Sequence, residues 1–146
     1  PGDVSITVSV SPGSIPADGS ATSLLSADVS CGGYDPVDGT QVDFNLAPQL
    51  DLSPTSPFTA AISSGVATRT ITAGTSVGVT AITGTVFSAT ISDTTTLTLL
   101  QPAVLTITKT ADPASGNQVE PGSIINYTVQ VEKPGFNGCH WRCHHR

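Results

Sequence analysis

Charged and aromatic side chains are scarce in this sequence, and methionine is absent. Charged residues make up 11% and aromatic residues 5% of the 146 residues. The net charge of −6 argues against nucleic-acid binding, because that binding depends on clustered Lys and Arg side chains. No apolar run reaches about 18 residues, so the sequence predicts no membrane span. It opens on Pro1 without a signal peptide, and we expect an interior fragment of a longer protein.

Histidine is missing up to Glu132, and Cys31 is the one cysteine in that region. A Ser-His-Asp or Cys-His arrangement is therefore impossible there. Asp35 and Asp38 form a pair of carboxylates, but their turn offers no apolar pocket to raise a pKa. We expect no enzyme. A single cysteine cannot staple its own domain, so we interpret Cys31 as a small residue at a strand end.

Short alternating segments dominate the first hundred residues and predict strands. In the segment after the turn residues Pro16, Asp18 and Gly19, the side chains of Leu25, Ala27 and Val29 share one face. Strands are predicted at 4–10, 22–30, 40–46, 58–62, 65–72, 76–83, 85–91 and 94–100, with Ser92 and Asp93 as a turn. Turn signals about every ten residues are typical of an immunoglobulin-like sandwich. We expect an all-β, Greek-key fold without a substantial helix.

Two loops interrupt this pattern, at 31–39 and at 47–57. The second holds three prolines, which cannot donate ladder hydrogen bonds. Between the loops, Val42, Phe44 and Leu46 are predicted to be buried, and Leu50 and Leu52 are expected to tuck under the sandwich. Val77, Val79 and Ala81 point to one side of a later strand.

A second module is predicted after a short linker at 101–103. Strands are expected at 104–113 and 123–132, and the second carries alternating Ile125, Tyr127, Val129 and Val131. Two strands cannot bury a core. We therefore expect residues 104–132 to be the start of an incomplete second β-sandwich repeat.

The first hundred residues resemble the bacterial immunoglobulin-like domain of the invasin and intimin type. The resemblance rests on IPADGSATSLLSADVS (15–30), PVDGTQVDF (36–44) and GVATRTITAGTSVGVTAIT (65–83). It implies a sandwich arranged in tandem on a secreted or cell-surface prokaryotic protein, an adhesin-like stalk whose copies mostly act as rigid spacers. Neighbouring repeats of the same chain would be its partners.

The next segment resembles the conserved repeat domain of bacterial and archaeal surface proteins, through LTITKTADP (105–113) and VEPGSIINYTVQVE (119–132). That family continues with an Asn-rich turn and an Ala-Thr-Asn-Val-type strand, whereas this sequence departs at Lys133. Residues 133–146 hold all three His, the only Trp and two of the three Cys. Deleting one adenine from the Lys133 codon gives a frame compatible with N-P-G-S-T-A-A-T-G-V-V-I-T. Our hypothesis is that this tail is frameshifted or non-native.

Metal ligands are candidates at two places. The tail carries soft ligands in a zinc-like spacing, but no second ligand pair lies nearby, so we expect at most adventitious binding by Cys139, His140, Cys143, His144 and His145. Asp3, Asp93 and Asp112 are candidates for Ca²⁺ at an interdomain junction, and turn capping is the alternative interpretation. No other cofactor is expected.

A binding role is the alternative to the spacer. Its loops would contact a host receptor, a cell-surface receptor or a glycan through the candidates Tyr34, Asp35, Asp38 and Phe58. A third hypothesis is a filament subunit that forms homo-oligomers by strand exchange. Asn126, Tyr127 and Thr128 also form an N-glycosylation sequon, which we interpret as a chance match in a bacterial chain.

Overall fold

The computed structural model describes residues 3–87, 91–133 and 142–144, the last three by their backbone. The described residues form eleven strands and no helix, so the described part holds no helix that could span a membrane. The chain divides into two compact units, Pro1–Pro102 and Ala103–Arg146. They are called the first and the second unit.

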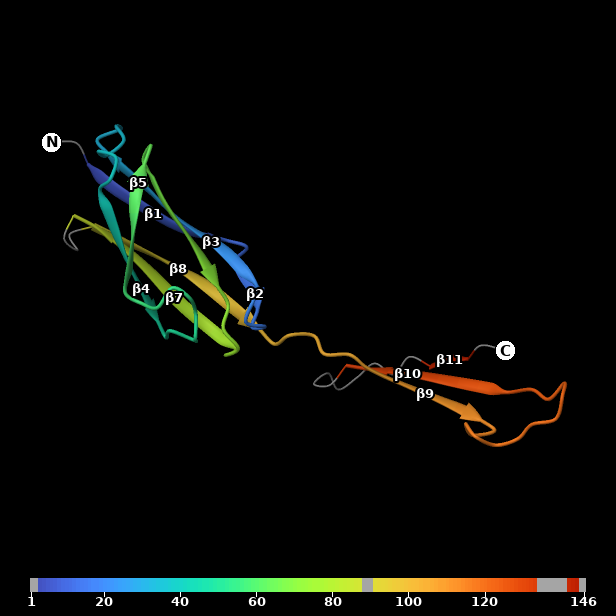
Figure 1. The fold of residues 1–146 in the computed structure, drawn as a ribbon. Coiled ribbons are helices and arrows are strands. Elements are labelled where there is room, and N and C mark those ends of the chain that lie inside the picture. The colour runs from blue at the N-terminus through green and yellow to red at the C-terminus, as the bar shows by residue number, and fades with distance from the viewer. Residues whose placement is uncertain (1–2, 88–90, 134–141, 145–146) are drawn as a thin grey trace. The chain divides into compact units, whose positions relative to one another are not determined.

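The first unit holds eight strands (Figure 1). They are β1 (Val4–Ser11), β2 (Ser14–Pro16), β3 (Thr22–Cys31), β4 (Gln41–Ala47), β5 (Phe58–Ser63), β6 (Val66–Thr72), β7 (Gly78–Val86) and β8 (Ile91–Leu100). Hydrogen-bonded neighbours follow the order β1-β3-β6-β5-β4-β7-β8-β2. All of these pairs are antiparallel except β2 with β8, which is parallel.

Strand β5 joins the two sheets of this sandwich. Its residues from Phe58 to Ala61 pair with β4, and its last residues, Ile62 and Ser63, pair with β6. One layer is thus β1-β3-β6 with the end of β5, and the other is β4-β7-β8-β2 with the start of β5. This division is the immunoglobulin-like arrangement, and it confirms the predicted all-β, Greek-key sandwich.

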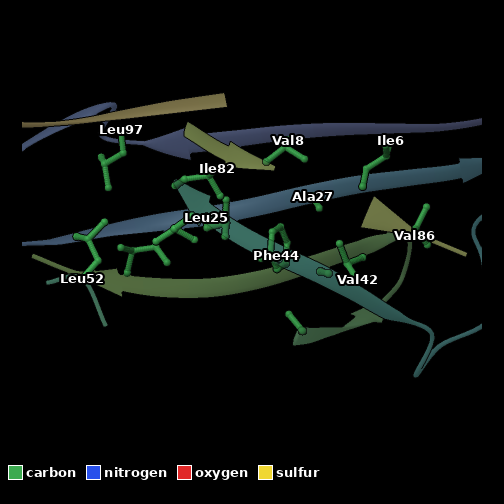
Figure 2. Packing of buried hydrophobic residues seen from close by; sticks show 14 of the residues in the cluster. Ile6, Val8, Leu25, Ala27, Val42, Phe44, Leu52, Ile82, Val86 and Leu97 are labelled. Atoms are coloured by element: carbon green, nitrogen blue, oxygen red, sulfur yellow. The ribbon is translucent and has the colours of Figure 1, made fainter. Parts of the chain in front are cut away.

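The core lies between the two layers and consists of alternate residues from each strand (Figure 2). Leu25, Ala27 and Val29 are buried as predicted, and so are Val42, Phe44 and Leu46 on β4. Leu52 is also buried, and Leu50 packs against the core. Each fully buried aliphatic or aromatic side chain of this kind contributes about 1.5–3 kcal/mol.

The predicted strand at 85–91 is wrong. β7 continues to Val86, β8 begins at Ile91, and these two residues form the last pair of the β7–β8 ladder. Phe87, the residue after β7, has a φ of 56°. Ser92 and Asp93, predicted as a turn, lie inside β8. The alternation runs through the hairpin without a Gly or Pro to mark it, so the pattern misplaced the turn.

Two further details differ from the expectation. Ser14–Pro16 forms the short strand β2, although this segment reads as part of a turn. On β7 the core side is the face of Thr80, Ile82 and Val86, whereas Val77 and Val79 lie on the exposed side. The buried Thr80 hydroxyl donates a hydrogen bond to the Pro48 carbonyl at 2.6 Å, which satisfies its polar group inside the core.

The second unit holds β9 (Thr106–Asp112), β10 (Asn126–Glu132) and β11 (Arg142–His144) in the order β11-β10-β9. The two predicted strands are confirmed as the antiparallel pair β9–β10. One face of this pair is apolar, and its side chains, such as Ile107 and Val129, are exposed. Lys109 lies over the Tyr127 ring at 4.3 Å. That these strands begin a second sandwich repeat stays a prediction, as does the origin of residues 133–146.

Candidate binding loops

The loop between β3 and β4 is braced at its base by backbone hydrogen bonds. The Cys31 and Tyr34 backbones exchange two, at 2.8 and 3.1 Å, and the Gly32 N–H donates to the Asp3 carbonyl at 2.8 Å. Gly32 and Gly33 have φ values of 59° and 82°, which glycine adopts without steric cost. Cys31 is half-buried at the end of β3 and is a free thiol, in agreement with its interpretation as a small residue at a strand end.

Asp35 and Asp38 both face the β5–β6 hairpin. The Asp38 carboxylate accepts a hydrogen bond from the Ser64 N–H at 2.8 Å. The Asp35 carboxylate lies against Gly65, where a Cβ would approach its Oδ1 to 2.7 Å. Ser64 and Gly65 have φ values of 49° and 81°, the pair of left-handed residues that a type I′ turn requires. The Asp38 carboxylate thus links the loop to the hairpin, and a ligand-binding role for Asp35 and Asp38 stays a prediction.

Tyr34 and Val37 project from the same loop into solvent. Their side chains are 79% and 81% exposed. Exposed aromatic and aliphatic side chains at a loop tip are available for contact with a partner. Of the four predicted ligand-binding residues, Tyr34, Asp35 and Asp38 are exposed and Phe58 is partly buried.

Phe58 lies elsewhere and packs inward. Its ring stacks on Phe44 with the centroids 5.5 Å apart and the planes 27° apart. It begins β5, whereas the loop of Tyr34 contacts the hairpin after Ser63. The length of β5 therefore separates the two aromatic residues by roughly 16 Å. The structure does not bring Phe58 together with Tyr34, Asp35 and Asp38.

Polar groups of the loop at 47–57 form hydrogen bonds within the loop and to the neighbouring strand β4. Ser56 accepts a hydrogen bond from the Leu46 N–H at 2.8 Å and donates one to Asn45 at 2.7 Å. Gln49 accepts from the Ser56 N–H at 2.9 Å and donates to the Leu52 carbonyl at 2.6 Å. This network orders the loop. The predicted long, irregular connection is confirmed.

Within the described residues, the predicted metal ligands do not come together in one site. Cys139, His140 and His145 lie outside those residues, and Cys143 and His144 belong to β11, of which the backbone alone is described. No three His, Cys, Asp or Glu side chains gather as a metal site within the described ranges. Both the adventitious binding and the interdomain Ca²⁺ stay predictions.

Asp93 has a defined structural partner that the sequence did not reveal. Its Oδ2 accepts a hydrogen bond from the Val8 N–H at 2.8 Å, which links β8 to β1. Asp3 lies before β1, and its carbonyl binds the Gly32 N–H; Asp112 belongs to the second unit. Asp93 was predicted in a turn, where aspartate is common, so its residue type did not point to this contact.

Asp18 lies in the turn before β3, and its carboxyl has a lowered pKa. Hydrogen bonds from the backbone N–H groups of Ala21 and Ser20, at 2.7 and 2.8 Å, lower the pKa of this exposed carboxyl. The role is the predicted Asx turn. The sequon residues Asn126 and Thr128 are exposed on the polar face of β10.

Comparisons with known proteins give one informative result. No family model matches the chain, and no curated protein sequence does. Among solved structures, it is similar to an adhesin of Yersinia pseudotuberculosis, InvE, with a TM-score of 0.54 and 22% identity, over 93% of this chain and 37% of that one. At this identity the likeness shows the fold: an invasin-type immunoglobulin-like arrangement. The chain spans little more than a third of that protein.

Proposed function

We propose that this chain is part of an adhesin-like protein exposed at a prokaryotic cell surface, and that its first unit is a structural spacer between neighbouring repeats. The fold likeness to InvE, over 93% of the chain, supports the adhesin-like setting. That solved protein is more than twice as long as this chain. A module that fills part of a longer surface protein is suited to hold other parts away from the cell.

The spacer role rests on one observation: several polar side chains in the loops of the first unit hydrogen-bond to other groups of the same unit. Asp38 binds the backbone of the β5–β6 hairpin, and Ser56 and Gln49 bind one another and their own loop. Phe58 packs on Phe44. A binding loop normally presents aromatic and polar groups to a partner. Here two of the four predicted candidates, Asp38 and Phe58, contact other residues of the module.

Catalysis is no part of the proposal. The residues up to Glu132 contain no His, and in the described ranges no cluster of His, Cys, Asp and Glu resembles a metal centre. The carboxylates of Asp35 and Asp38 face the hairpin.

The exposed pair Tyr34 and Val37 favours a second candidate, a module that binds a receptor or glycan through the loop at 31–39. Binding of the full chain to host cells and to a glycan array distinguishes the two functions. Tyr127→Ala is the matched control for Tyr34→Ala, because it removes the other tyrosine of the chain, in the second unit. The spacer predicts no saturable binding. Saturable binding that Tyr34→Ala abolishes and Tyr127→Ala preserves would replace the spacer with the binding module.

The exposed apolar face of β9–β10 favours a third candidate, a filament subunit that exchanges strands. Sedimentation of the full chain across a concentration series tests it. The spacer predicts a monomer throughout. Concentration-dependent polymers that a variant ending at Leu100 does not form would support the filament.

A further inference from the structure

The first and last strands of the first unit run side by side in the same direction. Val8 of β1 contacts Asp93 of β8, and farther along, Ile15 of β2 is paired with Leu99 of β8. The chain enters the sandwich at Val4, beside the end of β3, and leaves it beyond Leu100 at the opposite end (Figure 1).

This topology decides what tension does to the sandwich. A pull on the two ends of the first unit draws β1 and β2 one way along the strand axis and draws β8 the other way. The hydrogen bonds of a parallel pair such as β2–β8 are slanted but join the strands across that axis. They are therefore loaded together in shear, instead of breaking one after another as when a hairpin is peeled open.

The ladder between β2 and β8 is one of the parts that would carry this load. The Gly13 carbonyl accepts a hydrogen bond from the Thr98 N–H at 3.0 Å, and the Ala17 N–H donates to the Leu100 carbonyl at 2.8 Å. Ser14 and Pro16 alternate with these positions, so their backbone groups point away from β8. Proline is tolerated at such a position because no ladder hydrogen bond needs its N–H.

Asp93 supplies a second link between the terminal strands β1 and β8, and Gly84 of β7 lies beside it. The Asp93 carboxylate accepts from the Val8 N–H at 2.8 Å, and such charge-assisted bonds are stronger than neutral ones. Gly84 of β7 is paired with Asp93 of β8. A Cβ added at Gly84 would approach Val8 Cγ2 to 2.8 Å. The missing side chain lets Val8 pack closely against the opposite sheet, where Asp93 holds its backbone.

We propose that the first unit is a load-bearing module, and that the β2–β8 ladder and the Asp93–Val8 hydrogen bond together hold it under tension. The inference builds on the proposed spacer function, since a spacer at a cell surface transmits force between its neighbours. Its test is independent, because resistance to force is measured without any binding partner.

The experiment is stretching of single full-length chains at constant force, held at both ends. Unfolding of the first unit is identified by the release of roughly 100 residues, on the order of 330 Å. The test variants are Asp93→Ala and Ala17→Pro, which each remove one of the proposed bonds. The controls are Asp43→Ala, which removes another strand carboxylate, and Ser14→Pro, which leaves the β2–β8 bonds in place.

We expect each test variant to shorten the lifetime under force by about tenfold, and each control by less than about twofold. The unfolding rate in denaturant is measured on the same proteins. The test variants should shorten the folded-state lifetime by a larger factor under force than in denaturant. If the test variants shorten the lifetime by the same factor with and without force, the proposal is overturned. It is also overturned if the controls shorten the lifetime under force as much as the test variants do. Asp93→Ala decides the question alone if Ala17→Pro fails to fold. Cell binding can contradict the spacer without changing this result.

Discussion

The two units of this chain share one alternating pattern but differ in what becomes of it. In the first unit, Val42, Phe44 and Leu46 of β4 are buried in the core between the two sheets. In the second unit, β10 aligns Tyr127, Val129 and Val131 on one face in the same way, yet these side chains stay 40–49% exposed. An apolar face is a property of one strand, whereas its burial requires a second layer.

The contrast in stability should be largest for single buried residues. Phe44→Ala is expected to destabilise the first unit by about 3–5 kcal/mol, because the ring is fully buried and its loss leaves a cavity. Val129→Ala on the exposed face of β10 should change stability by less than about 0.5 kcal/mol. Denaturant unfolding of the full chain measures both. A comparable loss for the two variants would show that the second unit has a core of its own.

A smaller effect is expected from filling the space at Gly84. Gly84→Ala places a Cβ 2.8 Å from Val8 Cγ2 and 3.1 Å from Phe44 Cε1, and such overpacking costs about 1–3 kcal/mol. Gly13→Ala is the matched control, because its added Cβ meets no atom within 4 Å. Thermal unfolding compares the two. Equal melting temperatures would contradict the close approach of β1 to β7.

The smallest effect concerns pH. Hydrogen bonds from the Ala21 and Ser20 N–H groups lower the pKa of Asp18 below its ordinary value of 3.8. The ionised form is thus favoured in the folded state, so this stabilisation is complete above the unfolded pKa and is lost as the pH falls through the folded one. Asp18→Asn should therefore be less stable than the native chain at neutral pH, with the difference vanishing at acid pH. Stability curves that stay parallel from pH 7 to below about pH 3 would contradict the role of this turn.

The sequence predicted well what depends on neighbouring residues. The faces of β3 and β4 followed from their alternation, which is broken in β3 by Leu24, and the turn at Asp18 followed from its residue types. The strand end at Val86 was missed because the segment up to Ile91 keeps alternating through the hairpin. Ser14–Pro16 is too short to show a period, and its partner β8 is distant in the sequence.

The candidate site was harder to predict because it depends on contacts between residues that are distant in the sequence. Tyr34 and Phe58 both lie beside a loop in the sequence, and only the strand order reveals that β5 separates them. The hydrogen bond from Val8 to Asp93 joins residues 85 positions apart. Contacts of this range depend on how the layers come together, which no local pattern records.

Hydrogen exchange of the full chain, followed by mass spectrometry, tests the contrast between the units most directly. We predict slow exchange for the backbone amides of β3, β4 and β7, because they lie inside a closed core and open only with the whole unit. The amides of β9 and β10 should exchange far faster, since a small exposed sheet is marginally stable in water. Protection of β9 and β10 equal to that of β4 would contradict the account, because it would require a second buried core in this chain.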